Sequence, residues 1–232
     1  MKTNVKRTRR GFTLVELLVV IVIIASLAGL TAPMVIRQRK KADQTEATSN
    51  ARQIGLAMFE FETEYGSFPD SATATVVATN NPTSGYTLGT TTANDYFLQL
   101  FAANITQSEP MFFAKTGITT KPDGVITGAK CLAKGECGFG YILNGTVGLS
   151  TAGNPSRVIA VTPLLDGTPK FNPDPFDKKA VVLRIDNSVA SLNLDNTGEA
   201  SLGGGKKLFS GKDVDSIWGA DITPTPAYPL KK

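Results

Sequence analysis

The chain has 232 residues, enough for one long N-terminal element and one medium-sized domain. It contains no histidine, which excludes Ser-His-Asp and Cys-His catalytic arrangements and His-ligated metals. The formal net charge of +4 is misleading, because the first eleven residues hold five basic residues and no acidic one. The basic balance therefore gives no support to nucleic-acid binding, which stays a minor hypothesis. These basic residues are Lys2, Lys6, Arg7, Arg9 and Arg10.

Residues 12–36 form an almost unbroken apolar run, with Thr13, Glu16, Ser26 and Thr31 as its polar members. As a helix this run extends over about 37 Å, enough to cross a bilayer. Glu16 is the only charge between Arg10 and Arg37. A carboxylate inside a membrane span costs roughly 2.5–3.5 kcal/mol on insertion scales. We therefore expect Glu16 to have a partner of opposite charge.

Two simple explanations of this segment leave Glu16 unexplained. A secretory signal peptide fits the basic start, but its apolar part is normally only about 7–15 residues long and ends in an Ala-x-Ala site, which is missing here. A plain transmembrane anchor fits the length. Its orientation is left open, because basic residues also follow the span, at Arg37, Arg39, Lys40 and Lys41.

The stretch Arg10-Gly11-Phe12-Thr13-Leu14-Val15-Glu16 resembles the prepilin cleavage and N-methylation motif of type IV pilins and type II secretion pseudopilins. In that family the leader is cut after the glycine, and the new terminal residue, usually Phe, is N-methylated. The glutamate is the fifth residue of the mature chain. Gly11, Phe12 and Glu16 occupy the matching positions, and Pro33 falls where many members have a helix-kinking proline.

This resemblance implies a processed filament subunit. A prepilin peptidase would cut after Gly11 and methylate Phe12, and an assembly ATPase and platform protein would add the subunit to a homopolymer with other pilins or pseudopilins. In such filaments the carboxylate corresponding to Glu16 pairs with the N-terminal amine of a neighbour, which offsets its desolvation. The resemblance further implies a single pass through a bacterial inner membrane, a periplasmic C-terminal domain, and a filament in the periplasm or at the cell surface.

An amphipathic pattern follows the apolar run. Apolar side chains recur at spacings of three and four residues, typical of one helical face. They are Ala47, Ala51, Ile54, Met58, Phe61 and Tyr65. With Gly66 as a stop signal, the pattern predicts a helix over about 13–65, bent near Pro33. We interpret the stripe as packing against a sheet, and the basic cluster at 37–41 as a contact with lipid headgroups.

The chain after Gly66 is harder to interpret. Tyr65-Gly66-Ser67-Phe68-Pro69 resembles the segment that follows the long helix in major pseudopilins. Residues 70–95 are rich in Thr, Ala and Asn and predict a long surface loop. A short helix is expected at 94–103, capped by Asn94 or Asp95, with Met111-Phe112-Phe113 packed against it.

Four strands are expected in the second half of the chain, at 139–143, 157–162, 180–185 and 188–194. Asp186-Asn187 separates the last two as a hairpin turn. This pair resembles the Asp-Gly-Ser-Val hairpin of some pilin-like proteins, with Asn187 in the usual glycine position. Asn is one of the few other residues that tolerate the positive φ of such a turn.

Cys131 and Cys137 are the only cysteines, and their spacing fits a small disulfide loop in an oxidising compartment. Two free thiols and a two-cysteine metal site remain alternatives. Asp213, Asp215 and Asp221 are weak calcium candidates, because some major pseudopilins bind calcium in a C-terminal loop. Their spacing does not fit an EF-hand, and we favour solvated loop acids and no cofactor.

We found no enzymatic motif. Gly203-Gly204-Gly205-Lys206 lacks the spacing of a phosphate loop and predicts a flexible turn, and Gly148–Ala152 misses the nucleophile elbow.

The sequence therefore predicts an α+β pilin fold. A cleaved leader (1–11) precedes a transmembrane and polymerisation helix (12–36), its amphipathic half (37–66) and a loop-rich β domain (67–232). Within this class a major-type pseudopilin of type II secretion is favoured over a type IV pilin for adhesion or motility. A membrane-anchored binding module is the alternative from a different class.

Overall fold

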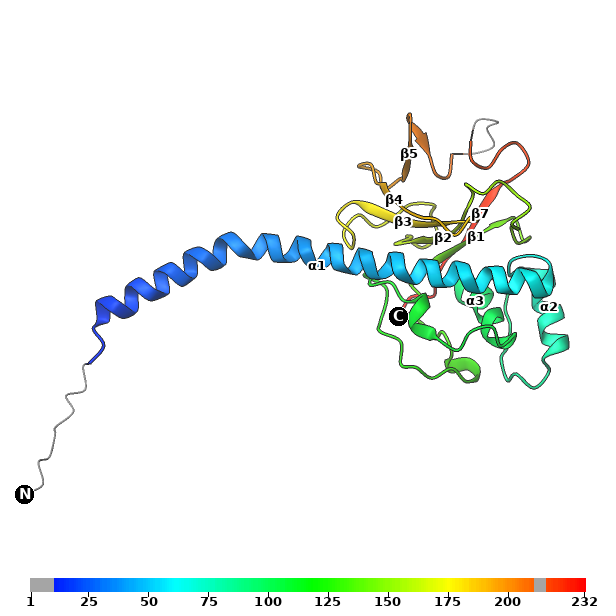
Figure 1. Cartoon of the computed structure of the whole chain (residues 1–232), viewed down its shortest axis with the longest axis horizontal. Coiled ribbons are helices and arrows are strands. Elements are labelled where there is room, and N and C mark those ends of the chain that lie inside the picture. Colours follow the sequence, from blue (N-terminus) through cyan, green and yellow to red (C-terminus); the bar gives the residue numbers. More distant parts are fainter. Residues whose placement is uncertain (1–10, 211–215) are drawn as a thin grey trace, which may run out of the picture. The chain divides into compact units, whose positions relative to one another are not determined.

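The computed structural model describes residues 11–210 and 216–232, without the side chains of residues 32 and 33. Met1–Arg39 and Lys40–Lys232 form two compact units. Helix α1 (Leu14–Tyr65) begins in the first unit and ends in the second (Figure 1). All the other helices and strands belong to the second unit.

The predicted long helix is confirmed. Helix α1 has 52 residues and ends at Tyr65, directly before Gly66, whose φ of +83° is the left-handed conformation that suits a glycine after a helix. The backbone is helical through residue 33. The side chain of Pro33 is not among the described parts, and the bend predicted near this residue stays a prediction.

The apolar stripe of α1 packs into the domain as expected. Ala47, Ala51, Ile54, Met58 and Phe61 are fully buried. Together with strand residues such as Tyr141 and Val182, they belong to one continuous hydrophobic core. Since the periodic face is covered by the domain, the stripe is packing rather than a ligand site.

Polar contacts fix the position of α1 on the domain. Asn50 donates two hydrogen bonds through Nδ2, to the carbonyl oxygens of Pro110 (3.0 Å) and Phe113 (2.9 Å). Near the C-terminal end of the helix, Glu62 accepts a hydrogen bond from the backbone N–H of Thr151 at 2.7 Å. These contacts join the helix to segments 60 to 89 residues away in sequence.

The long loop predicted over 70–95 is wrong in its first part, because residues 71–80 form helix α2 (Ser71–Asn80). Asp70 caps this helix: its Oδ1 accepts from the Thr73 N–H at 2.7 Å, and the Thr73 hydroxyl accepts from the Asp70 N–H. Gln99 binds both cap residues from the next helix. The helix therefore depends on a local cap that is held by a distant side chain.

Helix α3 (Ala93–Ala102) confirms the short helix expected at 94–103. Its cap is Thr92 rather than Asn94 or Asp95, and Asp95 completes the capping box from inside the first turn. The 3₁₀ helix η1 (Glu109–Phe112) packs against α3, with the ring of Phe112 5.0 Å from that of Phe97. A second 3₁₀ turn, η2 (Gly128–Lys130), follows.

The sheet is antiparallel, with five strands in the order β4-β3-β2-β1-β7. The four expected strands are present as β1 (Gly140–Asn144), β2 (Val158–Thr162), β3 (Lys179–Arg184) and β4 (Val189–Asn193). Asn187 has a φ of +62°, as the hairpin prediction requires. Every residue of β2 is buried, so both faces of the sheet are covered at its centre.

Three strands were not predicted from the sequence. Strand β7 (Pro224–Ala227) pairs with β1 at the edge of the sheet, where its prolines remove donors that an edge strand does not need. Strands β5 (Ser201–Gly203) and β6 (Lys206–Lys207) form a small ribbon (Figure 1). The glycine-rich turn predicted at 203–206 is confirmed, because it joins these two strands and all three glycines have positive φ.

Candidate functional site

The predicted cleavage bond lies in an open segment. Residues 11–13 precede the first turn of α1 without regular structure. Gly11 is exposed, and the Phe12 side chain is 74% exposed. The Gly11–Phe12 peptide bond is therefore sterically accessible to an enzyme. The basic residues of the leader, 1–10, lie outside the described residues.

Glu16 forms a capping box with Thr13 at the start of α1. Oε2 of Glu16 accepts hydrogen bonds from the backbone N–H of Thr13 (2.8 Å) and from its hydroxyl (2.7 Å). The Glu16 N–H in turn donates to Oγ1 of Thr13 at 3.3 Å. The carboxylate therefore satisfies donors at the helix N-terminus, where a negative charge is also favoured by the helix dipole.

The role of Thr13 was missed in the sequence. The signal was present, because Thr-x-x-Glu ahead of an apolar run is the pattern of a capping box. Both hydrogen bonds to the carboxylate fall on Oε2, and in the described part of the chain Oε1 accepts none. Glu16 can thus cap its own helix through one oxygen and present the other to a cation from outside.

The first unit exposes large apolar side chains on every side of the helix. Between Phe12 and Ile36 they are 47–87% exposed. In the described part of the chain, α1 is the one helix long and apolar enough to cross a membrane. A helix that is apolar all round needs lipid or other helices around it.

The two hydroxyl groups deeper in this segment are satisfied within the helix. Ser26 Oγ donates to the Val22 carbonyl at 2.8 Å, and Thr31 Oγ1 donates to the Leu27 carbonyl at 3.0 Å. Neither side chain therefore requires a polar partner in an apolar environment. This leaves Glu16 as the polar side chain of the segment that can bind a group from outside.

The predicted disulfide is not formed in this structure. Cys131 and Cys137 are free and buried, and Sγ of Cys137 donates to the Phe139 carbonyl at 3.3 Å. Burial raises the pKa of both thiols to about 12. At neutral pH both are protonated, so neither suits a reactive nucleophile or a thiolate metal ligand.

The calcium candidates are not brought together into a described site. Asp213 and Asp215 lie outside the described residues, and Asp221 is exposed. Calcium binding by this loop therefore stays an untested prediction.

A different group of acids meets in the loop after η1. One oxygen each of Glu109, Asp123 and Glu136 lies within 4.8 Å of the others. Glu109 accepts from the N–H groups of Gly124 (3.0 Å) and Leu132 (2.9 Å), and burial raises its pKa.

Glu136 is bonded in the same way, because its two oxygens accept from the backbone N–H groups of Asp123 and Ala133. Each buried carboxylate oxygen of this group thus has a partner within the chain. The acids organise the loop over residues 109–136, and in the described part of the chain no further His, Cys, Asp or Glu joins the group.

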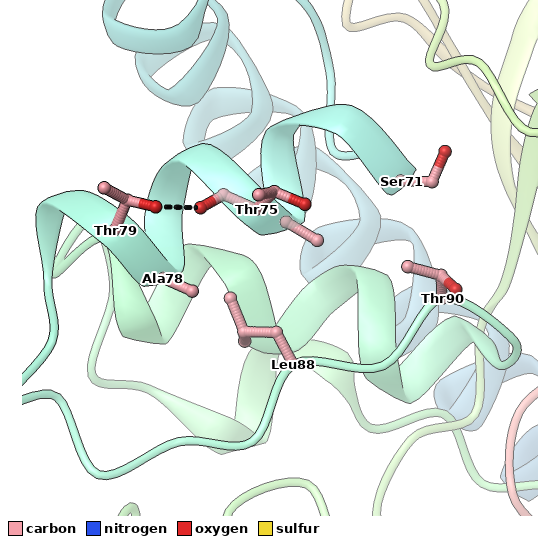
Figure 2. Close-up of a pocket in the computed structure, with 7 residues that line it drawn as sticks. Ser71, Thr75, Ala78, Thr79, Leu88 and Thr90 are labelled. Carbon is pink, nitrogen blue, oxygen red and sulfur yellow. Dashed lines mark hydrogen bonds between the residues drawn. The ribbon is translucent and has the colours of Figure 1, made fainter.

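A shallow hollow beside α2 offers little chemistry. It has a volume of about 390 Å³ and is lined by Ser71, Ala74, Thr75, Ala78, Thr79, Leu88 and Thr90 (Figure 2). Two of its hydroxyls already donate to backbone carbonyls, Ser71 to Thr146 and Thr79 to Thr75. With no charged side chain in the lining, the hollow lacks the acids and bases that catalysis requires.

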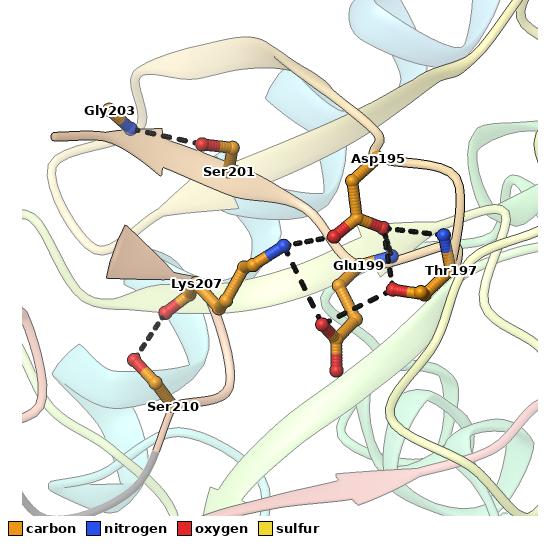
Figure 3. A network of polar contacts seen from close by, with 7 residues as sticks. All are labelled: Asp195, Thr197, Glu199, Ser201, Gly203, Lys207 and Ser210. Carbon is orange, nitrogen blue, oxygen red and sulfur yellow. Dashed lines mark hydrogen bonds and ion pairs between the residues drawn. The ribbon is translucent and has the colours of Figure 1, made fainter. Parts of the chain in front are cut away.

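A polar network ties the ribbon to the turn after β4. The Lys207 ammonium pairs with Asp195 and lies 3.6 Å from Oε2 of Glu199 (Figure 3). The other oxygen of Asp195 accepts from the Thr197 hydroxyl (2.7 Å) and from the Thr197 and Glu199 N–H groups (2.8 and 2.9 Å). These contacts lower the pKa of Asp195, with the bond from Lys207 as the largest cause.

Comparison with known proteins agrees with the N-terminal geometry. Residues 6–32 match the family model described as "Prokaryotic N-terminal methylation motif". This match includes Gly11, Phe12, Thr13 and Glu16. No solved structure matches the chain.

The similar curated proteins are mostly secretion-system components. The chain is 34% identical over 79 residues to the type II secretion system core protein G of Aeromonas hydrophila, covering 34% of this chain and 55% of that protein. It is 41% identical over 59 residues to core protein G of Escherichia coli, covering 25% and 41%. The type IV major pilin protein PilA of Myxococcus xanthus is 36% identical over 63 residues, covering 27% and 29%. The chain thus spans about half the length, or less, of these relatives.

Proposed function

We propose that this chain is a pseudopilin-type filament subunit that takes part in protein secretion. The observation that carries the proposal is the N-terminal methylation motif, with Glu16 capping the helix that follows. The secretion role is supported by the similarity to type II secretion core protein G in several bacteria. The proposed role is structural and needs no catalytic residue or cofactor.

Processing is the first step that we propose. A prepilin peptidase cuts the bond between Gly11 and Phe12, which the exposed segment before α1 leaves accessible. The cut creates a new amine on Phe12, four residues ahead of Glu16. The helix then anchors the subunit in the bacterial inner membrane, with the second unit in the periplasm.

Assembly follows from the two properties of the first unit. The free oxygen of Glu16 accepts the N-terminal amine of a neighbouring subunit, and this pairing compensates the cost of burying both charges. The apolar side chains of residues 12–36 exchange lipid for neighbouring helices, so little hydrophobic free energy is gained or lost. The platform protein and assembly ATPase of the secretion system are the partners that this process needs.

A type IV pilin for adhesion or motility is the second candidate, favoured by the similarity to the major pilin of Myxococcus xanthus. Both candidates share the assembly mechanism and differ in the machinery that the filament serves. Deleting the gene that encodes this chain distinguishes the two candidates. Loss of protein secretion supports the pseudopilin, and loss of surface filaments with normal secretion supports the pilin.

A membrane-anchored binding module is the alternative outside the filament class, and Glu16 separates it from a filament subunit. We expect Glu16→Ala to abolish filaments while cleavage at Gly11 proceeds. Glu16→Gln keeps an oxygen for the Thr13 cap but removes the charge, and we expect the same loss. Full assembly of Glu16→Gln would show that capping, not the charge, is required.

The mass of the mature chain gives an independent test. In membranes of cells with active prepilin peptidase, we expect a chain that begins with N-methylated Phe12. A chain that still begins at Met1 would overturn the proposal.

A further inference from the structure

We propose that the outward face of α1 binds a second copy of this chain, shifted along the helix so that its basic turn meets the acidic turn of the first. The basic turn is formed by Arg37 and Lys41, and the acidic turn by Glu60 and Glu64. This inference rests on the proposed filament function and assigns a lateral contact within it.

The outward face lies opposite the buried stripe. It is exposed at every helical turn from Lys41 to Glu64, and Leu56 is its only large apolar side chain. The exposed positions in this range are Lys41, Ala42, Thr45, Glu46, Ser49, Arg52, Gln53, Leu56, Glu60, Thr63 and Glu64. A mostly polar face of this kind is suited to contacts that form in water and can be remade.

The charges at the two ends of this face repeat one pattern. Arg37-x-Arg39-x-Lys41 is matched by Glu60-x-Glu62-x-Glu64, with each acid 23 residues after a base (37 to 60, 41 to 64). Residues four apart lie on the same side of a helix, so each turn presents a pair of like charges. The middle acid, Glu62, is already held by the Thr151 N–H, which leaves Glu60 and Glu64.

These charges have no ion-pair partner of their own. In the described part of the chain, Arg37, Lys41, Glu60 and Glu64 form none, and all four are exposed. The nearby Asp43 differs, because it is paired with Lys115 at 3.1 Å. Glu46 and Arg52, which lie between the two turns, are likewise exposed and form no ion pair in the described part of the chain, so the matched 23-residue spacing is what distinguishes the two turns.

The spacing dictates how two copies align. At about 1.5 Å per residue, Lys41 and Glu64 are separated by about 35 Å along the helix. Copies in one filament run parallel. The copy whose Phe12 amine reaches Glu16 is shifted by only about 6 Å, four residues at about 1.5 Å each. A different copy, shifted by about 35 Å, therefore brings the basic turn beside the acidic turn. Copies without a shift would place Arg37 beside Arg37 and Glu60 beside Glu60. Repulsion therefore disfavours a flat, unshifted pair and favours the staggered one.

Cross-linking of full-length chains in cells with the assembly machinery tests the alignment. One copy carries Lys41→Cys and a co-expressed copy carries Glu64→Cys, and the native cysteines are buried. A short bismaleimide should join the two copies. The matched control pairs Lys41→Cys with Ser49→Cys, an exposed position on the same face, and should give at least about fivefold less product.

Charge reversal tests the electrostatic basis. Arg37→Glu with Lys41→Glu, or Glu60→Lys with Glu64→Lys, should each reduce filament yield several-fold, and more at low salt because exposed charges are screened at high salt. Combining all four substitutions should restore most of the yield. Restoration by exchange is not expected from variants that merely misfold.

The outcomes separate this inference from the function on which it rests. If filaments form but the cysteine pair 41 and 49 cross-links better than the pair 41 and 64, the stagger is wrong and the filament function stands. The same holds if the variant with all four charge reversals does not regain assembly. If only the basic reversal impairs assembly, the basic turn binds anionic lipid headgroups instead. If wild-type chains form no filaments, both proposals fall.

Discussion

Gly55 of α1 lies directly against Asn187 of the β3–β4 turn: a Cβ on this glycine would be 2.1 Å from Oδ1 of Asn187 and 3.2 Å from Cδ1 of Leu183. Asn187 occupies a position with a φ of +62°, where glycine is the usual residue. The Asn187 side chain points toward α1. Gly55 has no side chain and therefore leaves room for it. The two residues are a complementary pair, 132 positions apart in sequence.

This pair predicts the effect of Gly55→Ala. In an exposed helix the substitution would stabilise by about 1 kcal/mol. Here we expect destabilisation by about 1–3 kcal/mol, because the methyl group overlaps Asn187. Thermal unfolding of the full chain in detergent measures it. Asn187→Gly removes the overlapping side chain and should restore stability to Gly55→Ala; equal loss in the single and double variants would contradict the pairing.

The Thr13 cap predicts the state of the first turn of α1. Thr13→Val removes both hydroxyl bonds to Glu16 and keeps the shape of the side chain. Loss of such a cap costs about 1 kcal/mol, so the first turn should fray. Hydrogen exchange of the Glu16 and Leu17 amides, which donate to Oγ1 and to the carbonyl oxygen of Thr13, should rise about fivefold in micelles. Thr13→Ser retains the hydroxyl and should exchange like the wild type; equal exchange in the two variants would refute the capping role.

The buried thiols predict a pattern of labelling. At pH 8 we expect maleimide to leave Cys131 and Cys137 unmodified in the folded chain and to modify both after denaturation, since their pKa values of about 12 leave almost no thiolate. Mass spectrometry counts the adducts. A mass 2 Da below the reduced value, without labelling after denaturation, would instead establish the disulfide expected from the sequence.

The same pKa values give the sign of an alkaline effect. The folded-state pKa of each thiol is raised from the ordinary value of 9.0 to about 12, so the folded chain holds these protons more tightly. The free energy of unfolding should therefore fall as the pH rises from about 9 to about 12. Replacing both cysteines with alanine should reduce this dependence, and an unchanged slope would contradict it.

Asp195 predicts an effect at acidic pH. Its pKa is lowered, chiefly by the hydrogen bond from Lys207, so its contribution to stability is complete above the unfolded value of about 3.9 and is lost as the pH falls through the folded value. Asp195→Asn should flatten the acid side of the stability curve. Asp174→Asn, at an exposed position, is the matched control and should leave the curve unchanged. If both variants behave like the wild type, Lys207 does not stabilise the ionised carboxylate.

The sequence by itself determined the parts of this protein that depend on near neighbours. The N-terminal motif lies within six consecutive positions, from Gly11 to Glu16. The long helix follows from a 3.6-residue period that needs no distant contact. The hairpin at Asn187 and its positive φ were predicted for the same reason, because turn chemistry is local.

Tertiary structure decided whatever depends on distant pairing. Residues 71–80 are helical with a cap held by Gln99, Pro224 and Pro226 become strand only by pairing with β1, and Lys207 finds Asp195 across a turn. In each case the local preference is weak or misleading, and packing with a remote segment supplies the missing free energy. The local sequence therefore specifies the N-terminal motif and the long helix on which the proposed processing and anchoring rest, and the packing of remote segments specifies the fold of the domain.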